Sequence, residues 1–377
     1  MNCKTIAPVA GFLFFWYVTP HVPWPMAPEK CAGADTAHKG GQNVRILFWN
    51  TENLYDFRDD SLTADEEFTP GGAKRWSYAR FQTKLQHTAK VILAAGDRNP
   101  PGIIGLCEIE NRYVLNKLVY ESPLKSYGYR IIHRDSPDPR GSDVALLYHP
   151  DQFFPIYREW IGIRFPFDTI SHTRDILYVK GILMGADTIH LFVNHWPSRR
   201  GGEEQSASRR NYVAQRLREK VDSVLISPYL VSGDREPSVL QSAIPSPCIL
   251  IMGDFNDEPE NESLHSILQA RYVSEGNHPG GLINLMSGRQ VEEGNHKFGS
   301  EWSFLDQFIV SGALLNQQNT IYIDSGSAWI FCPDFLLEND LKYLGKKPRR
   351  TYLGPRYQGG FSDHLPILVD IIVNGKK

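Results

Sequence analysis

Short polar clusters stand at the ends of apolar, strand-like runs throughout this chain, and no other feature limits the possible folds as strongly. Several of the runs are continuous stretches of β-branched and apolar residues, which is typical of strands covered on both faces. A rigid scaffold places catalytic groups at strand ends and in the adjoining loops. The clusters are Asn50-Thr51-Glu52-Asn53, Glu108-Ile109-Glu110-Asn111, Asn194-His195-Trp196, Gly253-Asp254-Phe255-Asn256-Asp257, Ser303-Phe304-Leu305-Asp306-Gln307 and Ser362-Asp363-His364.

Strand-like and helix-like segments alternate from Val44 onwards without an internal repeat or a convincing linker, which predicts one α/β domain over residues 44–374. Strands are predicted at Val44–Trp49, Ile103–Leu106, Arg130–His133, Asp143–Tyr148, Tyr178–Met184, Ile189–Asn194, Cys248–Met252, Phe308–Val310 and Leu365–Ile372. Helices are predicted at Tyr78–Ala95, Arg112–Val119, Ser208–Leu225 and Glu262–Gln269. Loop insertions are predicted at Ser232–Pro247 and Ser325–Gly360, and a loop as long as the second usually serves or covers a site.

The chain of 377 residues has a net charge of −3, whereas proteins that hold nucleic acid by neutralising phosphates are usually basic. Charge alone therefore argues against a tight, non-specific duplex binder, although an enzyme needs only a local positive cleft and a metal. The cysteines show no zinc-binding spacing. Cys107 and Cys248 lie in or beside apolar runs and are expected to be buried free thiols, and a disulfide framework is not expected.

The first residues carry an apolar run, Ile6–Val18, preceded by Lys4. The run is too short for a comfortable membrane span and is typical of the apolar region of a signal peptide. Ala32-Gly33-Ala34 resembles a cleavage site, although it lies far from the run. The alternatives to a cleaved signal peptide are an uncleaved N-terminal anchor and a true start of the chain at Met26. Residues 1–43 are thus predicted to be a leader plus linker, and the protein to be secreted, periplasmic or envelope-anchored.

The residue types in the polar clusters predict a metal site. Asp, Glu and Asn oxygens are hard ligands that suit Mg²⁺, Mn²⁺ or Ca²⁺. Cys107 is the only thiol among the clusters, which disfavours zinc. Histidine adds phosphate contacts or proton transfer. A divalent cation would neutralise the charge of a phosphodiester, which otherwise repels hydroxide.

The same motifs carry a resemblance to a known family. The segments WNTENLYD, LCEIEN, RGSDVALLY, NHWPS, GDFND, LDQF and SDHLP occur in the order and approximate spacing of the endonuclease/exonuclease/phosphatase family. That family includes deoxyribonuclease, abasic-site endonucleases, bacterial sphingomyelinases and inositol-polyphosphate phosphatases. The resemblance implies a four-layered α/β sandwich, with two mixed β-sheets packed face to face and helices on the outer faces. It also implies single-step hydrolysis by water, without a covalent enzyme intermediate.

The resemblance further implies roles for individual residues. Metal ligation or proximity to the metal falls on Glu108, with Asn50 and Asp363. His195 is placed at the scissile phosphate or the leaving oxygen, and Asp254 and Asn256 align the attacking water and hold the phosphate. Asp306 is placed on the metal or phosphate side of the site. His364 also has a catalytic role. Which aspartate orients His364 stays open. Apart from the resemblance, substrate contacts are assigned to Asn53, Arg199 and Arg209; the two arginines could track phosphates, although a solvated helix face and loop explain them almost as well.

Several residues are given no catalytic role. Glu110 is expected to be a solvated carboxylate or one at a helix N-terminus, and His190 to be structural. His296 has no accompanying signature. Gln307 stands where many family members carry His, Arg or Tyr, which bears on the class of substrate. Trp196 and Trp302 are expected to pack at least as readily as to stack on substrate.

A nucleic acid is the favoured substrate, with DNA and RNA both open, and we expect a monomer without an obligate protein partner. A phospholipid, sphingomyelin or inositol phosphate is the first alternative. An exposed aromatic hairpin for membrane insertion would favour a lipid, and the sequence shows no clear candidate. An inactive binding module is the second alternative, which the complete set of polar clusters disfavours.

Overall fold

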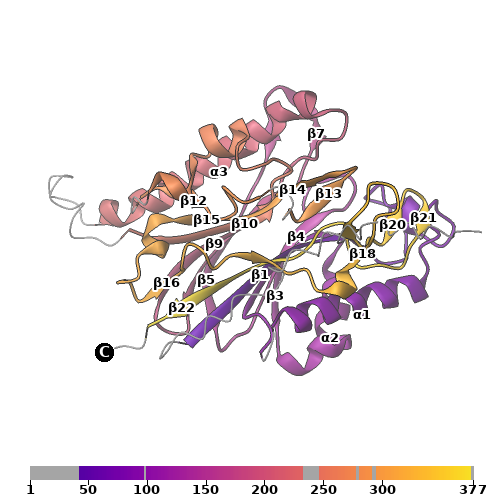
Figure 1. Cartoon of the computed structure of the whole chain (residues 1–377), viewed down its shortest axis with the longest axis horizontal. Helices are drawn as coiled ribbons and strands as arrows, with labels where there is room; N and C mark the ends of the chain where they lie inside the picture. Colours follow the sequence, from indigo (N-terminus) through magenta and orange to yellow (C-terminus); the bar gives the residue numbers. More distant parts are fainter. Residues whose placement is uncertain (1–41, 97–98, 232–245, 277–279, 291–293, 375–377) are drawn as a thin grey trace, which may run out of the picture.

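Two mixed β-sheets form the centre of the molecule (Figure 1). The structure is a computed structural model that describes residues 42–96, 99–231, 246–276, 280–290 and 294–374. The predicted leader, at residues 1–43, therefore lies almost wholly outside the described residues, as does most of the Ser232–Pro247 insertion. Among the described residues, no helix is both long and apolar enough to cross a membrane.

The first sheet has seven strands and contains both chain-terminal strands of the domain. β1 and β2 run parallel, and β22 pairs with the other edge of β1 in the antiparallel sense. The order is β16 (Ile321–Tyr322), β22 (Ile367–Val373), β1 (Gln42–Leu54), β2 (Ile103–Ile109), β4 (Asp143–Tyr148) and β3 (Arg130–His133), with β17 (Trp329–Ile330) also pairing with β22.

The second sheet also has seven strands, and its centre is built from β9, β10 and β15. β9 and β10 are parallel, whereas β10 and β15 are antiparallel. The order is β11 (Ala270–Tyr272), β12 (Leu282–Asn284), β15 (Asp306–Ser311), β10 (Cys248–Asp254), β9 (Asp187–His195), β8 (Ile176–Leu183) and β5 (Phe153–Ile161).

Helices cover the outer faces of the two sheets (Figure 1). α1 (Tyr78–Ala95) and α2 (Arg112–Glu121) lie on the side of the first sheet, and α3 (Glu203–Val231) on the side of the second. One core fills the space between the sheets and beneath α1 and α2, and a second lies between the second sheet and α3. The apolar face of α3 is the predicted one, since Val213, Leu217, Val221 and Val224 are all buried.

Small two-stranded sheets and short helices project from this sandwich. The hairpins are β6 (Arg164–Phe165) with β7 (Asp168–His172), β13 (His296–Phe298) with β14 (Glu301–Ser303), β18 (Leu337–Asn339) with β19 (Lys346–Pro348), and β20 (Tyr352–Leu353) with β21 (Arg356–Tyr357). The short helices are η1 (Glu66–Phe68), η2 (Pro123–Tyr127), η3 (Ser263–Ile267), η4 (Val273–Glu275), η6 (Gly312–Leu315) and η7 (Asp334–Leu336).

The predicted segments agree with most of the sandwich, with two corrections. The Glu262–Gln269 helix is only a π-helical turn over Ser263–Ile267. The Ser325–Gly360 insertion is not a plain loop, because it contains β17, η7 and the hairpins from β18 to β21. The strands β5, β11, β12 and β16 of the two sheets were not predicted.

The described cysteines differ in chemical state. Cys107 and Cys248 are buried free thiols, as predicted. Cys332 is disulfide-bonded.

Candidate active site

The strand ends of both sheets bring the predicted site residues into register. In the second sheet His195 pairs with Asp254 across β9 and β10, and Asp254 pairs with Asp306 across β10 and β15. In the first sheet Asn50 pairs with Cys107 across β1 and β2. The two rows touch, because Asn50 Nδ2 donates to Asp254 Oδ2 at 2.9 Å. Residues more than two hundred positions apart in the chain therefore line one edge of the sandwich.

Irregular backbone at the ends of β1 and β2 directs Glu108 towards this edge. The β1–β2 register shifts between Asn50 and Leu54, and the β2–β4 register shifts between Cys107 and Ile109. Bulges of this kind are common beside active sites because they change the direction of a side chain. Glu108 also has a φ of 57°, which costs free energy for a residue other than glycine and is found mainly where function requires it.

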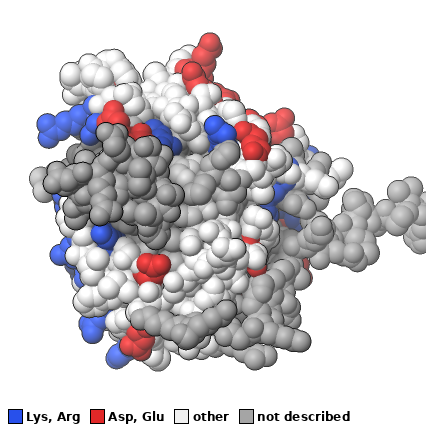
Figure 2. All heavy atoms as spheres, turned by 90° about the vertical axis from the view of Figure 1, so that its left-hand side faces the viewer, with Lys and Arg blue, Asp and Glu red and all other residues white. Residues whose placement is uncertain are grey.

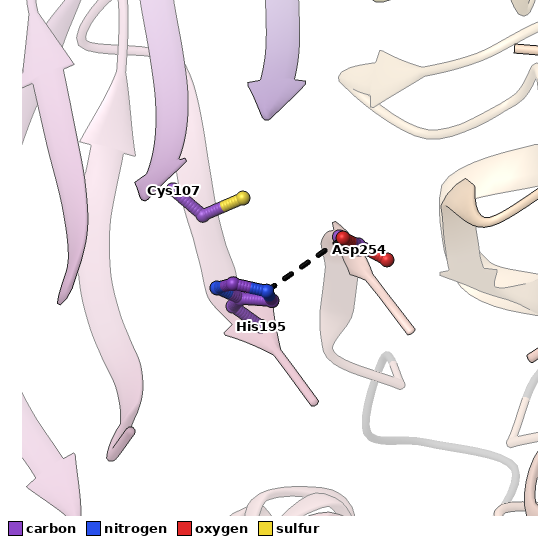
Figure 3. Close-up of side chains that lie close together, drawn as sticks. All are labelled: Cys107, His195 and Asp254. Atoms are coloured by element: carbon purple, nitrogen blue, oxygen red, sulfur yellow. Dashed lines mark ion pairs between the residues drawn. The ribbon is translucent and has the colours of Figure 1, made fainter. Parts of the chain in front are cut away.

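Asp254 is the centre of the polar contacts. Besides Asn50, its Oδ2 lies 3.7 Å from His195 Nε2 and 3.9 Å from His364 Nε2. Its Oδ1 accepts a hydrogen bond from the Asn256 backbone at 2.9 Å. In Figure 3, His195 and Asp254 face each other from neighbouring strands, with the Cys107 thiol beside them. Both imidazoles therefore face one carboxylate at distances that leave room for a bridging oxygen atom.

Asp306 orients His364, which answers the question that the sequence left open. Asp306 Oδ2 and His364 Nδ1 are 2.6 Å apart, and the Ser362 hydroxyl accepts a hydrogen bond from the His364 backbone at 3.0 Å. Burial opposes charge on His364, but Asp306, Asp254 and Asp363 outweigh it and raise the pKa of this histidine well above its ordinary value. His364 is therefore a cationic imidazole whose Nε2 faces Asp254.

His195 has the opposite protonation preference. Burial, and then the nearby cations Arg174 and Arg140, lower the pKa of His195 well below its ordinary value. Its Nδ1 is buried without a hydrogen-bond partner among the described residues. Its Nε2 lies 3.9 Å from Glu108 Oε1. A neutral and a charged imidazole on either side of Asp254 can perform different steps of one acid–base reaction.

Glu108 and Asp363 form the acidic side of the site. Burial, and then Asp363, raise the pKa of Glu108. Burial acts in the same sense on Asp363, but Arg350 and His364 outweigh it and lower the pKa of that carboxyl. Arg350 binds Asp363 Oδ2 at 2.7 Å. Glu108 Oε2 accepts only the Asn53 backbone, at 2.9 Å, among the hydrogen bonds of the described residues.

The GDFN turn after β10 is fixed by a close approach of two strands. A Cβ added to Gly253 would lie 2.6 Å from Asn194 Cβ and 2.7 Å from its carbonyl oxygen, so only glycine fits there. Asn256 follows with a φ of 52°, and its Nδ2 donates to the Trp196 carbonyl at 3.1 Å. The Asn256 amide therefore holds the neighbouring loop while Asp254 faces the site.

The predicted substrate-binding residues have different surroundings. Asn53 is at the site through its backbone bond to Glu108. Arg199 Nε donates to the Asn256 carbonyl at 2.7 Å, and its other nitrogens bind acidic and amide groups nearby. Arg209 lies on α3 and binds Asp168 and Ser171, and no contact among the described residues joins it to the catalytic side chains. Their roles towards substrate stay predictions.

His296 is a site residue that sequence reasoning missed. It forms an isolated β-bridge with His364, and the two rings lie 4.6 Å apart between centroids. Its Nδ1 is buried without a partner among the described residues, and burial lowers its pKa to about 3. No spacing in the sequence signals this contact, because it depends on the approach of the β13–β14 hairpin to the segment before β22.

Two arginines beside His195 were also missed. Arg174 is buried and donates to the carbonyls of His195 and Trp196, at 3.1 and 2.6 Å. It pairs with Asp138 at 2.9 Å, and Asp138 also binds Arg140 at 3.2 Å. The Arg140 side chain is 45% exposed, so it offers a positive charge to an anion at the rim of the site. Arg140 belongs to the RGSDVALLY motif, which is the signal that could have identified it.

Other expectations are settled by burial. Glu110 is not solvated: it accepts the Asp56 backbone, and burial raises its pKa to about 9. His190 is structural, since its Nδ1 lies 2.7 Å from the Tyr178 hydroxyl. Gln307 is buried and bonds to Asn284 and to the carbonyls of Asp257 and Phe304, so its departure from the family pattern does not alter the site surface. Trp196 is buried and packs on Phe255.

The donor set fits a hard divalent cation. Glu108 and Asp363 bring carboxylates to one side of the site, and Asn50 adds an amide oxygen. Asp306 Oδ1 is buried without a hydrogen-bond partner among the described residues. Cys107, His195 and Asp254 also have ligand atoms within 4.8 Å of one another. Burial raises the pKa of the Cys107 thiol well above its usual value.

Comparison with known proteins identifies the family and agrees with the fold. The model of the "Endonuclease/Exonuclease/phosphatase family" matches residues 45–373. No curated protein matches the chain. Two solved structures of family proteins are similar in fold. The one from Bacteroides thetaiotaomicron has 14% identity, covers 89% of this chain and 99% of its own, and gives a TM-score of 0.50. The one from Bacteroides vulgatus has 11% identity, covers 88% of this chain and 100% of its own, and also gives a TM-score of 0.50. A Bacteroides thetaiotaomicron mannosyl-6-phosphatase is also similar (16%, 87% and 99%, TM-score 0.49).

Proposed function

Since the chain belongs to the endonuclease/exonuclease/phosphatase family and is a hydrolase of phosphate esters, we propose that it cleaves phosphodiesters with the help of a divalent cation. The observation that carries this proposal is the arrangement of Asp306, His364 and Asp254 opposite Glu108. A nucleic acid strand is the first candidate substrate, because the motifs resemble those of deoxyribonucleases and abasic-site endonucleases.

The protein side chains supply most of the chemistry in this proposal. Asp254 orients the attacking water and accepts its proton, since its Oδ2 is the group that both imidazoles face. Cationic His364 holds a nonbridging phosphate oxygen through Nε2, and Asp306 keeps its ring in place. Neutral His195 donates from Nε2 to a second oxygen or to the leaving group.

The cation, when bound near Glu108, Asn50 and Asp363, neutralises negative charge on the phosphate. Mg²⁺ suits these oxygen ligands, and Mn²⁺ and Ca²⁺ are alternatives. Arg140 and Arg350 add positive charge at the rim. Local placement of cations, rather than the net charge of −3, is what binding a phosphate requires.

A substrate panel tests the proposal. Plasmid DNA, RNA, sphingomyelin and bis(p-nitrophenyl) phosphate would each be incubated with the full chain and Mg²⁺, Mn²⁺, Ca²⁺ or EDTA. We expect cleavage of a diester with metal, loss of cleavage with EDTA, and loss of cleavage in Asp254→Asn. Asp151→Asn, an exposed carboxylate away from the site, is the matched control. No cleavage of any of these diesters, or cleavage insensitive to EDTA, would contradict the proposal.

A lipid phosphodiester is the second candidate, favoured by one observation. Phe298, at the end of β13, is 82% exposed beside the site residue His296, and an exposed aromatic side chain on a hairpin favours a lipid substrate. The same panel separates the candidates, because only this one predicts that sphingomyelin or a phospholipid in vesicles is cleaved faster than plasmid.

We also propose that the protein is exported. The apolar run Ile6–Val18 and the disulfide at Cys332 support export. Mass spectrometry of the native protein and fractionation of its cells would test it. We expect a shortened N-terminus outside the cytoplasm, or an intact one in the membrane fraction. An intact chain beginning at Met1 in the cytoplasm would contradict export.

A further inference from the structure

Two hairpins beside the site present large apolar side chains to solvent. Phe298 is 82% exposed at the end of β13, and Leu341 and Leu344 are 92% and 74% exposed in the turn between β18 and β19. Tyr343 between them is partly exposed, and a Cβ on Gly299 would lie 3.9 Å from its ring. We call Phe298, Leu341, Tyr343 and Leu344 the apolar tip. In Figure 1 the labels β13, β14 and β18 lie close together on one side of the sandwich.

A buried ion pair joins the two hairpins into one rigid unit. Lys297 Nζ lies 3.0 Å from Asp340 Oδ2, and both side chains are almost fully buried. The same ammonium group donates to the carbonyls of Leu344 and Lys346, at 3.3 and 3.2 Å. Leu341 and Leu344 are therefore held outward on an ordered turn.

The turn of the apolar tip satisfies much of its own backbone. Asp340 Oδ1 accepts the backbone N–H groups of Lys342 and Tyr343, both at 3.1 Å, and the Asp340 N–H donates to the Gly345 carbonyl at 2.9 Å. Lys297 binds the Leu344 and Lys346 carbonyls. A backbone N–H or C=O group without a hydrogen-bond partner is costly to move from water into an apolar phase. The internal hydrogen bonds of this turn therefore lower the cost of inserting it into a bilayer.

The turn between β18 and β19 carries mostly positive charge, whereas Glu301 on β14 is exposed opposite Phe298. Residues 337–349 contain Lys342, Lys346, Lys347 and Arg349 against Glu338 and Asp340. Asp340 is neutralised by Lys297, and Glu338 lies 3.4 Å from Lys347. Lys342, Lys346 and Arg349 are exposed. Apolar side chains that project from a basic rim are complementary to a bilayer with anionic headgroups.

We propose that the apolar tip docks on an anionic lipid bilayer and inserts Phe298, Leu341 and Leu344 among the headgroups. Leucines form no hydrogen bonds with bases and stack poorly, so a nucleic acid strand matches this surface less well than a bilayer does. His296 precedes Phe298 by two residues on β13, a separation of roughly 7 Å. Docking would therefore hold the active site close to the headgroup layer. Docking does not depend on which phosphate ester is hydrolysed.

Hydrogen–deuterium exchange of the full chain locates the contact. The chain would be measured alone, with vesicles of phosphatidylglycerol and phosphatidylcholine, with phosphatidylcholine vesicles, and with a single-stranded oligonucleotide. We expect slower exchange in residues 296–303 and 337–349 with the anionic vesicles only. This readout is local, so membrane affinity of the apolar run Ile6–Val18 does not obscure it.

Matched variants test the side chains. Phe298→Ser with Leu341→Ser and Leu344→Ser should abolish the protection and weaken vesicle binding by about tenfold or more. Leu62→Ser with Ile170→Ser removes side chains that are 90% and 88% exposed elsewhere, and should change neither. Lys342→Glu with Lys346→Glu should weaken binding to anionic vesicles alone.

Three results would overturn the proposal. The first is unchanged exchange at the apolar tip with anionic vesicles. The second is protection by the oligonucleotide in place of vesicles, which would assign the surface to nucleic acid. The third is a dimer of the full chain that the triple variant loses, which would assign it to a second copy. Hydrolysis is not read in any arm, so failure here is distinct from failure of the proposed activity.

Discussion

At the scale of residues, opposite protonation of two histidines organises the site. His364 is drawn towards its charged form by Asp306 at 2.6 Å, whereas burial and Arg174 keep His195 neutral. Asp254 lies between them, within 4 Å of both. This arrangement gives a phosphate ester one cationic contact, one neutral donor and one carboxylate for water, without any covalent step.

Glu108 provides the first prediction at this scale. Glu108→Gln removes the anionic oxygen that the bulge at the end of β2 directs into the site. We expect kcat to fall by roughly a hundredfold or more at saturating Mg²⁺, because charge neutralisation by the metal is worth several kcal/mol. Calorimetric titration should show weaker Mg²⁺ binding with an unchanged circular dichroism spectrum. Glu204→Gln, an exposed residue of α3, is the control. Near-normal kcat in Glu108→Gln would remove Glu108 from the metal site.

At the scale of elements, a buried charge cluster fastens the long 325–360 segment to the sandwich. Glu52 accepts the backbone N–H groups of Thr351 and Tyr352, at 2.6 and 3.1 Å. Lys84 of α1 donates to the Thr351 hydroxyl at 2.6 Å and to the Phe361 carbonyl at 2.5 Å. β17 pairs with β22 near the start of the segment, and these contacts hold its end against β1 and α1, where Arg350 reaches Asp363.

Glu52→Gln tests this attachment. The amide can accept one of the two N–H groups but not both, so a buried donor is left unpaired. We expect a loss of about 1–3 kcal/mol in the free energy of unfolding, together with faster amide exchange at Thr351 and Tyr352. Chemical denaturation and exchange measurements check both effects. Glu67→Gln, an exposed carboxylate, is the matched substitution. Equal stability of the two variants would mean that Glu52 does not hold the segment.

Local patterns predicted the elements but not their long-range partners. The β10 strand and its GDFN turn are continuous in sequence, so an apolar run followed by glycine was enough to predict them. The glycine is needed because two strands approach closely at Gly253. The contact of His296 with His364, and the bond of Glu52 to Thr351, join segments whose distance depends on the whole sandwich. The apolar tip was missed for the same reason, because exposure of Leu341 and Leu344 depends on the Lys297–Asp340 pair.

At the scale of the whole molecule, the placement of individual charged side chains matters more than the net charge. Figure 2 shows the side of the sandwich on the left of Figure 1, where the basic and acidic residues drawn are interspersed. The cations that face the site, Arg140 and Arg350, are held by Asp138 and Asp363. Placement of a few arginines therefore matters more for binding phosphate than the net charge does.

The stability of the whole molecule should depend on pH through His190. Burial, and then Lys180 and Lys220, lower the pKa of His190 to about 4, and the Tyr178 hydroxyl bonds to its Nδ1. The unfolded chain, with a pKa of about 6.5, binds this proton more readily. Stability should therefore fall as the pH drops from about 6.5 towards 4, by roughly 2–3 kcal/mol from this group.

His190→Gln removes this titration while keeping a hydrogen-bond acceptor for Tyr178. Chemical denaturation between neutral pH and about pH 4 should show a shallower loss of stability in the variant than in the parent protein. Parallel curves for the two proteins would show that His190 does not contribute to acid sensitivity.

A double-mutant cycle on Asp306 and His364 tests the central claim most directly, namely that these two residues act as one catalytic unit. Their side chains meet at 2.6 Å, although the residues are 58 positions apart. Asp306→Ala and His364→Ala should each lower kcat for the diester by at least about a hundredfold. The double variant should be little worse than the poorer single variant, because parts of one unit are strongly non-additive. Fully additive losses, or a normal kcat in Asp306→Ala, would contradict the account.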